Sequence, residues 1–432
     1  MRSSIFIAVV MCLAAHAAPS LALAQAVAPI PRRAESAAEL LVFFDIDDSM
    51  LRQFIDHRPL HEDESEALAH ILFALPKLPP EEVVRWIKPQ PDWQGLIEAP
   101  QDHRTEMFHL TGRVKRVEKV KLIPEVAERY EFGHYYLADV KLGADELSVV
   151  VCTRQIPQAW KLDAAIDETV GFDGMFLKLG DQPIFAAKRL AWHPNKHDAA
   201  AGIGADQVFL GDLEMDVGLW DNVVDRSGLG GGDREAFYQL LAAMGRTKPA
   251  NLAEKSTTQF DFADLLRTPE KFHGRLLTIE GTARRAAKII VSDEDIRQRF
   301  GIDHYYEVYV FVQLEKKIVF KKGDEQLEFN AFPVACCVRQ LPPGMDEGDN
   351  IRQNVRVSGA FLKLWLYESP QMTQFDPRQM QPSPMLIGLE PELIPNSSPP
   401  NEYLGPIIGT LFVLSLLGVW MFVWRLVGRS SP

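Results

Sequence analysis

The stretch FGHYYLADV, residues 132–140, has a near-copy in IDHYYEVYV, residues 302–310. In both stretches a His-Tyr-Tyr triplet precedes a run in which apolar residues recur at every second position. Such alternation is typical of a β-strand with one buried face. A strand that occurs twice indicates either a paired active site or one structural module present in two copies.

The sequence around these two strands also corresponds, in the same order. Residues 55–75 align without a gap on residues 224–244, at an offset of 169 positions. The offset becomes 185 where CTRQIP at 152–157 meets CVRQLP at 337–342. Ordered matches over this length indicate a tandem duplication. The His-Tyr-Tyr triplet is therefore repeated because a whole unit is repeated.

Each unit is predicted to hold a helical segment followed by a β-rich segment. The predicted divisions are repeat 1 at 43–195 (helical 43–98, β 99–195), repeat 2 at 212–395 (helical 212–267, β 268–395), and linkers at 25–42, 196–211 and 396–403. In the helical segment, Asp63 with Glu66 resembles a capping box, and Pro80 is placed to start a second helix.

The β-rich segments read as five short strands bounded by Gly, Pro or Asp. In the second copy these strands lie at 276–286, 304–313, 329–340, 355–366 and 384–393. A first strand with a central glycine, then a hairpin, then V-x-V-x-G-x-F-x-K, resembles an OB-fold-like barrel. The resemblance implies an α+β fold with two small five-stranded barrels, and it implies no particular ligand because this architecture hosts unrelated functions.

The overall composition is that of a globular protein. The chain has 432 residues, of which 47% are hydrophobic and 24% charged, and its formal net charge is −13. Affinity for nucleic acid depends on basic groups that displace phosphate counterions. The charge balance therefore predicts no nucleic-acid partner.

Both ends carry patterns typical of membrane targeting. Arg2 precedes a short apolar run and small residues, which predicts a signal peptide over residues 1–24. Residues 404–424 lack charge over the length of a transmembrane helix, and a basic tail follows at 425–432. The positive-inside rule then predicts a single-pass protein of the cell membrane with its tail in the cytoplasm and its repeats outside.

The predicted partners follow from this placement. They are the membrane itself, another envelope protein, or an anionic lipid surface. Gly405 and Gly409 form a G-x-x-x-G pattern, which predicts a homodimer through the membrane helix as an alternative.

The repeated histidine and tyrosines are candidate ligand-facing residues. Alternation places His134 and Tyr136 on one strand face, and His304 with Tyr306 on the equivalent face of the second copy. A histidine at a barrel mouth can act as a general base or a metal ligand. The alternative is a polar residue that caps a row of core side chains, and we favour it because no second ligand recurs at metal-binding spacing.

The cysteines and arginines of the CTRQIP and CVRQLP strands form a second candidate group. Arg154 and Arg339 each follow a cysteine by two positions, and a guanidinium lowers the pKa of a neighbouring thiol. The residues before Cys152 and Cys337 are apolar, which favours small buried hydrophobic side chains instead.

The last candidates are lysines. The second copy carries 15 extra residues between its second and third strands, predicted as a basic hairpin with Lys316, Lys317, Lys321 and Lys322. It could contact an acidic partner, or be a solvated tip that lysines protect from strand pairing. Lys178 and Lys363 recur in the FLKL strands and are expected to extend along the barrel wall.

Together these observations predict a non-enzymatic binding or scaffold protein of the cell envelope. No catalytic residues, metal ligands or cofactor site are predicted from the motifs. Two alternatives stay open: a redox or hydrolytic accessory enzyme that uses the recurring His and Cys positions, and an assembly protein that associates through its membrane helix.

Overall fold

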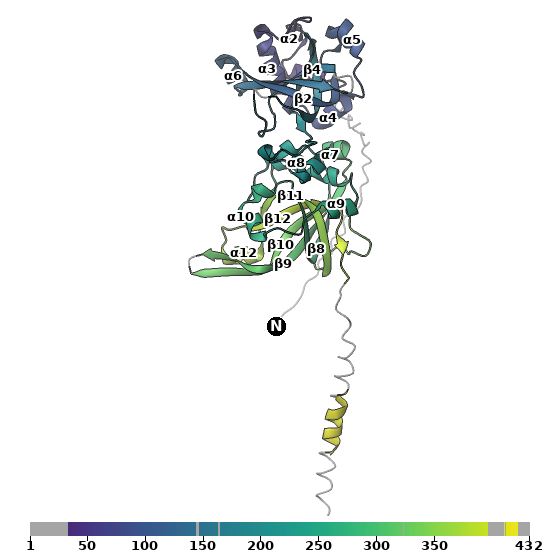
Figure 1. The fold of residues 1–432 in the computed structure, drawn as a ribbon, viewed down its shortest axis with the longest axis vertical. Coiled ribbons are helices and arrows are strands. Elements are labelled where there is room, and N and C mark those ends of the chain that lie inside the picture. The colour runs from purple at the N-terminus through teal and green to yellow at the C-terminus, as the bar shows by residue number, and fades with distance from the viewer. Residues whose placement is uncertain are drawn as a thin grey trace, which may run out of the picture.

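The computed structural model describes residues 33–143, 147–162, 165–322, 324–395, 410 and 412–421. Over these residues the chain forms two successive α+β units, each with its own barrel (Figure 1). The predicted α+β class and the duplication of a helical segment plus barrel agree with this architecture.

The first barrel is a ring of five strands. They are β2 (Met107–Lys121), β3 (His134–Leu142), β4 (Leu147–Thr153), β5 (Glu168–Leu179) and β6 (Pro183–Ala187). The order β2-β3-β4-β6-β5 is closed by pairing of β2 with β5. Only β4 and β6 are parallel neighbours within this ring. Short strands β1 (Ile87–Lys88) and β7 (Ala191–Trp192) flank it.

The second barrel repeats this scheme. Its strands are β8 (Leu276–Ile290), β9 (His304–Lys322), β10 (Glu325–Val338), β11 (Gln353–Tyr367) and β12 (Gln381–Gly388), with β13 (Glu392–Leu393) at one side. The order β12-β10-β9-β8-β11 is closed by pairing of β12 with β11, and β10 and β12 are parallel. Closure leaves neither barrel with an open sheet edge across its wall.

The two barrels bend at equivalent residues. A Cβ on Gly112 or on Gly281 would lie 2.4 Å from the carbonyl oxygen of Lys141 or Phe311, so only glycine permits these strand crossings. The strand register also shifts after Val114 in β2 and after Ala283 in β8, 169 positions apart. Such bulges increase local twist and help a small sheet to close.

Helices cover the outer wall of each barrel. The first unit contains α1 (Ala37–Leu41), α2 (Asp48–Leu51), α3 (Ser65–Ala74), α4 (Pro80–Trp86), α5 (Trp93–Glu98) and α6 (Pro124–Tyr130). The apolar face of α3 packs against β4, β5 and β6 in one buried cluster. The capping box predicted from Asp63 and Glu66 is wrong: His61 and Glu64 form it instead, while Pro80 does begin α4.

The second unit has counterparts of most of these helices, and it has α12 in addition. Its helices are α7 (Ala205–Asp212), α8 (Gly231–Met244), α9 (Pro249–Lys255), α10 (Phe262–Arg267), α11 (Glu294–Phe300) and α12 (Pro370–Phe375). All but the last residue of helix α7 lies in the segment 196–211 that was expected to be a linker, and the helix matches α1 at the offset of 169. Its Leu210 is fully buried, as is Leu41 in α1. The correspondence between the units therefore begins earlier in the chain than the sequence pattern shows.

The two units share a core. One buried cluster joins the interior of the first barrel, including Phe108 and Phe185, to Leu240 of α8 and Ile387 on the outer wall of the second barrel. Helices α7 and α8 accordingly lie between the two barrels (Figure 1). The units are packed together and do not merely follow one another.

The predicted membrane anchor is corrected by the structure. Among the described residues no helix is long and apolar enough to cross a membrane. Of the predicted span 404–424, the structure describes residues 410 and 412–421. The transmembrane helix, the membrane partner and the single-pass localisation are therefore wrong as predicted. Residues 1–24, Gly405 and Gly409 lie outside the described residues.

Candidate functional site

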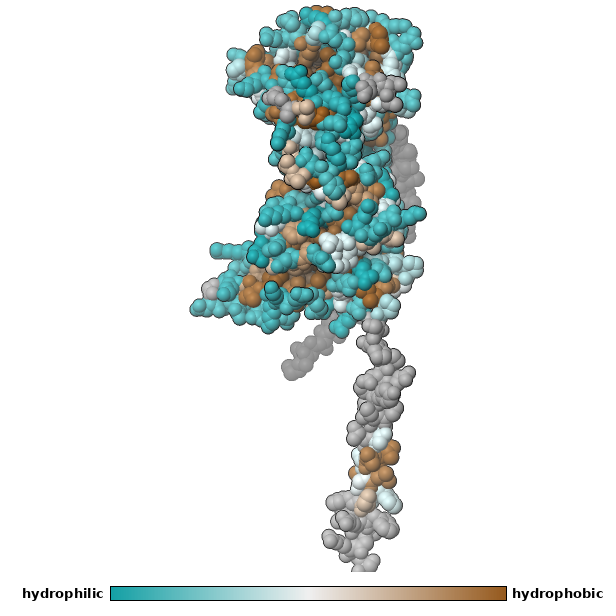
Figure 2. Space-filling model, in the orientation of Figure 1, coloured by the Kyte–Doolittle hydropathy of each residue, from teal (hydrophilic) through white to brown (hydrophobic). Residues whose placement is uncertain are grey.

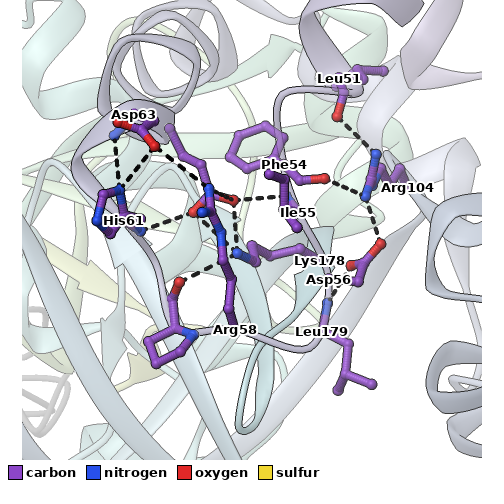
Figure 3. A network of polar contacts seen from close by, with 12 residues as sticks. Leu51, Phe54, Ile55, Asp56, Arg58, His61, Asp63, Arg104, Lys178 and Leu179 are labelled. Carbon is purple, nitrogen blue, oxygen red and sulfur yellow. Dashed lines mark hydrogen bonds and ion pairs between the residues drawn. The ribbon is translucent and has the colours of Figure 1, made fainter.

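A fully buried ion pair in the first unit joins a barrel strand to the start of the helical layer. Lys178 of β5 and Glu64, just before α3, both have fully buried side chains, with Nζ–Oε distances of 2.7 and 3.0 Å (Figure 3). Glu64 also accepts hydrogen bonds from the backbone N–H groups of Ile55 and His61. Burial raises the pKa of Glu64, but these hydrogen bonds outweigh it and hold the pKa below its usual value.

A strand bulge explains why this lysine turns away from water. The register between β5 and β6 shifts between Phe176 and Lys178, which directs the lysine toward the helical layer. The expectation that Lys178 extends along the barrel wall to solvent is thus wrong. Its ammonium group also lies 3.5 Å from the carbonyl oxygen of Pro59.

Asp56 fixes the loop beside this pair. Its carboxylate accepts from the N–H of Leu179 at 2.9 Å and pairs with Arg104 at 2.6 Å. Arg104 in turn donates to the carbonyl oxygens of Leu51 and Phe54 (Figure 3). Every member of this network binds the loop before α3 to the barrel, which is a structural role.

The second unit reproduces the network. Lys363, at the equivalent bulge of β11, pairs with Asp233 at 2.6 Å, and both side chains are nearly or fully buried. Asp225 accepts from the N–H of Leu364 at 2.7 Å and pairs with His273 at 2.9 Å. We call Lys178–Glu64 and Lys363–Asp233 the lysine–carboxylate clamps. Because they recur with the fold, we assign them to stability.

The His-Tyr-Tyr triplets divide between two environments. The middle tyrosines are buried under the helices: Tyr135 is 3% exposed and Tyr305 is 9% exposed. Tyr136 and Tyr306 are half-buried beside the barrel interiors. His134 is half-buried, its Nε2 lies 3.1 Å from the Tyr136 hydroxyl, and burial lowers its pKa.

The second histidine has a different partner. His304 Nδ1 lies 2.7 Å from the exposed carboxylate of Asp303, and its ring meets Tyr306 edge-on. Within the described residues, no group of three or more His, Cys, Asp or Glu side chains is placed to hold a metal ion. The structure therefore gives each histidine a local tyrosine contact in both copies.

The three cysteines among the described residues are buried, as their apolar neighbours predict. Cys152, Cys336 and Cys337 are free thiols with at most 1% exposure. Burial raises the pKa of Cys152 to about 12 and raises those of the other two further. Thiolate, the reactive form, is therefore scarce at neutral pH.

The two arginines that were considered as partners of these thiols contact other groups. The Arg154 guanidinium lies over the ring of Phe132 at 4.2 Å, and Arg339 donates to the carbonyl oxygen of Gly301 at 3.4 Å. Partial burial lowers the pKa of both arginines. Each arginine thus packs over the turn that precedes its own His-Tyr-Tyr strand.

The four hairpin lysines lie on a ribbon that extends the second barrel. Residues 312–322 of β9 and 325–333 of β10 project as two paired strands, and this ribbon is mostly hydrophilic on the viewed face (Figure 2). Lys317 pairs with Glu328, and Lys322 pairs with Asp376. Residues 315–328 hold four lysines and four carboxylates, so the ribbon is less basic than its lysines alone suggest.

A cationic cleft in the second unit was missed by the motif analysis. It has a volume of about 270 Å³ and lies where α10 passes into the next short helical turn and β8. Its lining consists of Asp264, Arg267, Thr268, Lys271, Phe272 and Arg275. The gapless alignment holds the signal, because the first unit has Glu98, Asp102 and Glu106 where the second has Arg267, Lys271 and Arg275.

Comparisons with known proteins add little. No family model matches the chain, and no curated protein matches it. A deletion variant of the single-stranded DNA-binding protein from Thermus aquaticus is among the solved structures that match, at 9% identity and a TM-score of 0.15. The match covers 68% of this chain and 97% of that one. A similarity this low supports no statement about function, and the description of the barrels rests on their strand pairings.

Proposed function

We propose that the chain is a non-enzymatic binding protein with OB-like barrels, and that the ribbon of β9 and β10 is its contact element. The observation that carries the proposal is that the ribbon has a core of its own. Phe329 and Phe332 are buried against Met372 of α12. An insertion that is folded against a helix presents its side chains in a fixed arrangement, which is how rigid scaffolds display binding residues.

The outer face of the ribbon combines charge with an exposed apolar residue. Alternation leaves Lys317, Val319 and Lys321 on the face opposite the buried Phe329, and Val319 is 40% exposed. Among the described residues, β9 beyond residue 311 is paired with β10 alone, so its other edge can accept an added strand. An extended peptide could add to this edge as a strand.

Although lysines and carboxylates are equally numerous along the ribbon, we take an acidic segment as the partner because two of these lysines are left to contact it. Among the described residues, Lys316 and Lys321 lie on the ribbon without a carboxylate partner, whereas Lys317 and Lys322 are paired. Opposite charges across an added strand contribute to pairing, and like charges oppose it. The proposal is thus an extended acidic protein segment along β9.

The alternative of a redox or hydrolytic enzyme has less support. Its candidate nucleophiles, Cys152 and Cys337, are sealed from solvent and their pKa values are raised by burial. A reactive cysteine needs a partly exposed and electropositive site.

A labelled peptide of alternating Glu and Val residues tests the proposal by fluorescence anisotropy with the full chain. We expect saturable binding that weakens with salt, and a loss of about five- to tenfold in Lys316→Glu/Lys321→Glu. The matched control is Lys119→Glu/Lys121→Glu, which changes the net charge equally at exposed positions of β2. Equal binding by wild type and the ribbon variant, or equal loss in the control, would contradict the proposal.

A further inference from the structure

We infer that the cationic cleft beside α10 is a binding site for a small phosphate-bearing molecule. Three of its lining side chains are cations, Arg267, Lys271 and Arg275, and one is a carboxylate, Asp264. On a chain with a net charge of −13, this is a local reversal of sign. A concave surface with one sign of charge raises the local concentration of the opposite ion.

The cations are largely available to a ligand. Arg267 contacts Asp264 at 3.2 Å, and both side chains are more than half exposed, so a dianion can displace this weak pair. The Arg275 guanidinium lies 5.0 Å from the centre of the Phe272 ring, and both side chains line the cleft. Two guanidinium groups and one ammonium group suit the oxygen atoms of phosphate, which guanidinium binds through paired N–H groups.

The backbone around the cleft is held independently of any ligand. The Arg226 guanidinium donates to the carbonyl oxygens of Leu266 and Arg267, both at 2.9 Å, and so caps the last turn of α10. Thr268 Oγ1 donates to the carbonyl oxygen of Asp264 at 3.1 Å. These contacts offset the negative end of the helix and leave the cleft positive.

The first unit supplies an internal control with the same backbone. Helices α5 (Trp93–Glu98) and α10 (Phe262–Arg267) have identical lengths at the offset of 169. The short 3-10 helices that follow, at Pro100–His103 and Pro269–Phe272, match equally well. A difference in anion binding between these sites would therefore come from side-chain charge and not from backbone shape.

The partners at the equivalent positions have also changed. In the first unit, Glu106 pairs with Lys88 at 2.5 Å and with His103 at 3.2 Å. In the second unit, Arg275 replaces Glu106 and Thr257 replaces Lys88. The exchange removes the cation and the carboxylate of one ion pair and leaves a guanidinium that faces the cleft.

The size of the cleft favours a small ligand over a polymer. Its volume of about 270 Å³ lies just below the range of about 300–1,000 Å³ that is usual for drug-sized ligands. We therefore choose inorganic phosphate and pyrophosphate as probes, titrated into the full chain at constant ionic strength and followed by calorimetry. Saturable binding with pyrophosphate tighter than phosphate is expected, because the second phosphoryl group adds charge. Absence of binding up to about 10 mM would overturn the inference.

Matched variants separate a specific site from diffuse charge. Arg267→Glu/Lys271→Asp installs the residues of the first unit and should weaken pyrophosphate binding by at least about tenfold. Lys316→Glu/Lys321→Glu has the same net charge and should bind within about twofold of wild type. Equal loss in both variants would overturn the site. The ribbon variant tests peptide binding, and the cleft variant tests pyrophosphate binding. Either the proposed function or the phosphate site can therefore be refuted without the other.

Two further arms test the ligand class and the role of the backbone. The reciprocal variant Glu98→Arg/Asp102→Lys/Glu106→Arg should gain a second pyrophosphate site in the first unit. If it gains none, the claim that charge alone distinguishes the two sites is overturned. A thymidine oligonucleotide that displaces pyrophosphate at a lower phosphate concentration would overturn the assignment to a small molecule.

Discussion

The lysine–carboxylate clamps and the segments around α5 and α10 show two outcomes of one duplication. The clamps have kept their chemistry: a buried lysine at a strand bulge pairs with a carboxylate before a helix in both units. The α5 and α10 segments have kept their backbone while the charges on them have reversed. The buried positions that hold the helices to the barrels thus differ little between the units, whereas the solvent-facing positions differ in charge, which decides what they can bind.

The position of each unit in the molecule adds a third kind of difference. Asp47 and Asp216 are equivalent residues that accept backbone hydrogen bonds at the start of a helical turn. Asp47 is exposed, and hydrogen bonds from Ser49 and Met50 lower its pKa. Asp216 is buried at the junction with the first barrel, and burial raises its pKa to about 6 in spite of Arg189 at 2.6 Å. The surroundings of these two equivalent aspartates therefore shift their pKa values in opposite directions.

The largest expected effect is the loss of a clamp. Lys178→Met should lower the free energy of unfolding by about 3–5 kcal/mol, because Glu64 is left as a buried charge without its cation. Lys363→Met should have an effect of similar size through Asp233. Urea denaturation followed by circular dichroism measures both changes.

A double variant separates the missing charge from lost packing. Lys178→Met/Glu64→Leu replaces the pair by apolar side chains and should recover much of the lost stability. A loss below about 1 kcal/mol for one lysine and above 3 kcal/mol for the other would break the equivalence of the two clamps.

The next effect concerns Asp216 and Asp47. A folded-state pKa above the ordinary 3.8 means that folding favours protonated Asp216, so its contribution to stability declines as pH rises from about 4 to about 6. Relative to Asp216→Asn, the wild type should lose up to about 3 kcal/mol over this range. Unfolding free energies measured between pH 4 and pH 7 provide the test.

The control for this effect has the opposite sign. Because the pKa of Asp47 is lowered, its contribution is present above the ordinary 3.8 and is lost as pH falls through the folded-state pKa. Relative to Asp47→Asn, the wild type should therefore gain stability as pH rises through about 4. The same sign for both aspartates would refute the comparison between an exposed and a buried cap.

Periodicity predicted the strands well and their ends less well. Strands starting at residues 276 and 304 were expected at the residues where β8 and β9 begin. Strand β9 continues to Lys322, beyond the expected end at 313, and in this extension Ile318 and Phe320 pack against the cluster of Phe329, Phe332 and Met372. Helix α7 was not predicted because its sequence resembles that of α1 only weakly. The two helices correspond in a buried leucine, Leu41 in α1 and Leu210 in α7. The membrane anchor was predicted from an uncharged stretch and the basic tail that follows it.

The site residues were harder to predict than the fold. A bulge turns Lys178 from the barrel wall to the helical layer, and strict alternation contains no signal for it. The alignment did hold two usable signals that a search for motifs overlooks: a carboxylate at both Glu64 and Asp233, and the reversed charges at the cleft. The chemistry of this protein is better read from differences between the copies than from what they share.

The smallest expected effect lies on the wall of the first barrel. His109 Nδ1 lies 2.8 Å from Asp173 across β2 and β5, and this hydrogen bond raises the pKa of His109. In the second unit the equivalent residues are Thr278 and Ser358, whose hydroxyl oxygens lie 2.7 Å apart and are buried. An ionic pair faces water in one copy, and a neutral pair is covered in the other.

Asp173→Asn should lower the pKa of His109, and Glu214→Gln should lower it less, because Glu214 acts only through its charge. A raised histidine pKa stabilises the fold below about pH 6.5, and this contribution is lost as pH rises through the folded-state pKa. Since the pair is about half exposed, we expect less than about 1 kcal/mol. NMR titration of the His109 ring protons measures the pKa. Thr278→Val should change stability equally at all pH values, so a pH-dependent change there would show that the neutral pair is not the equivalent of the ionic one.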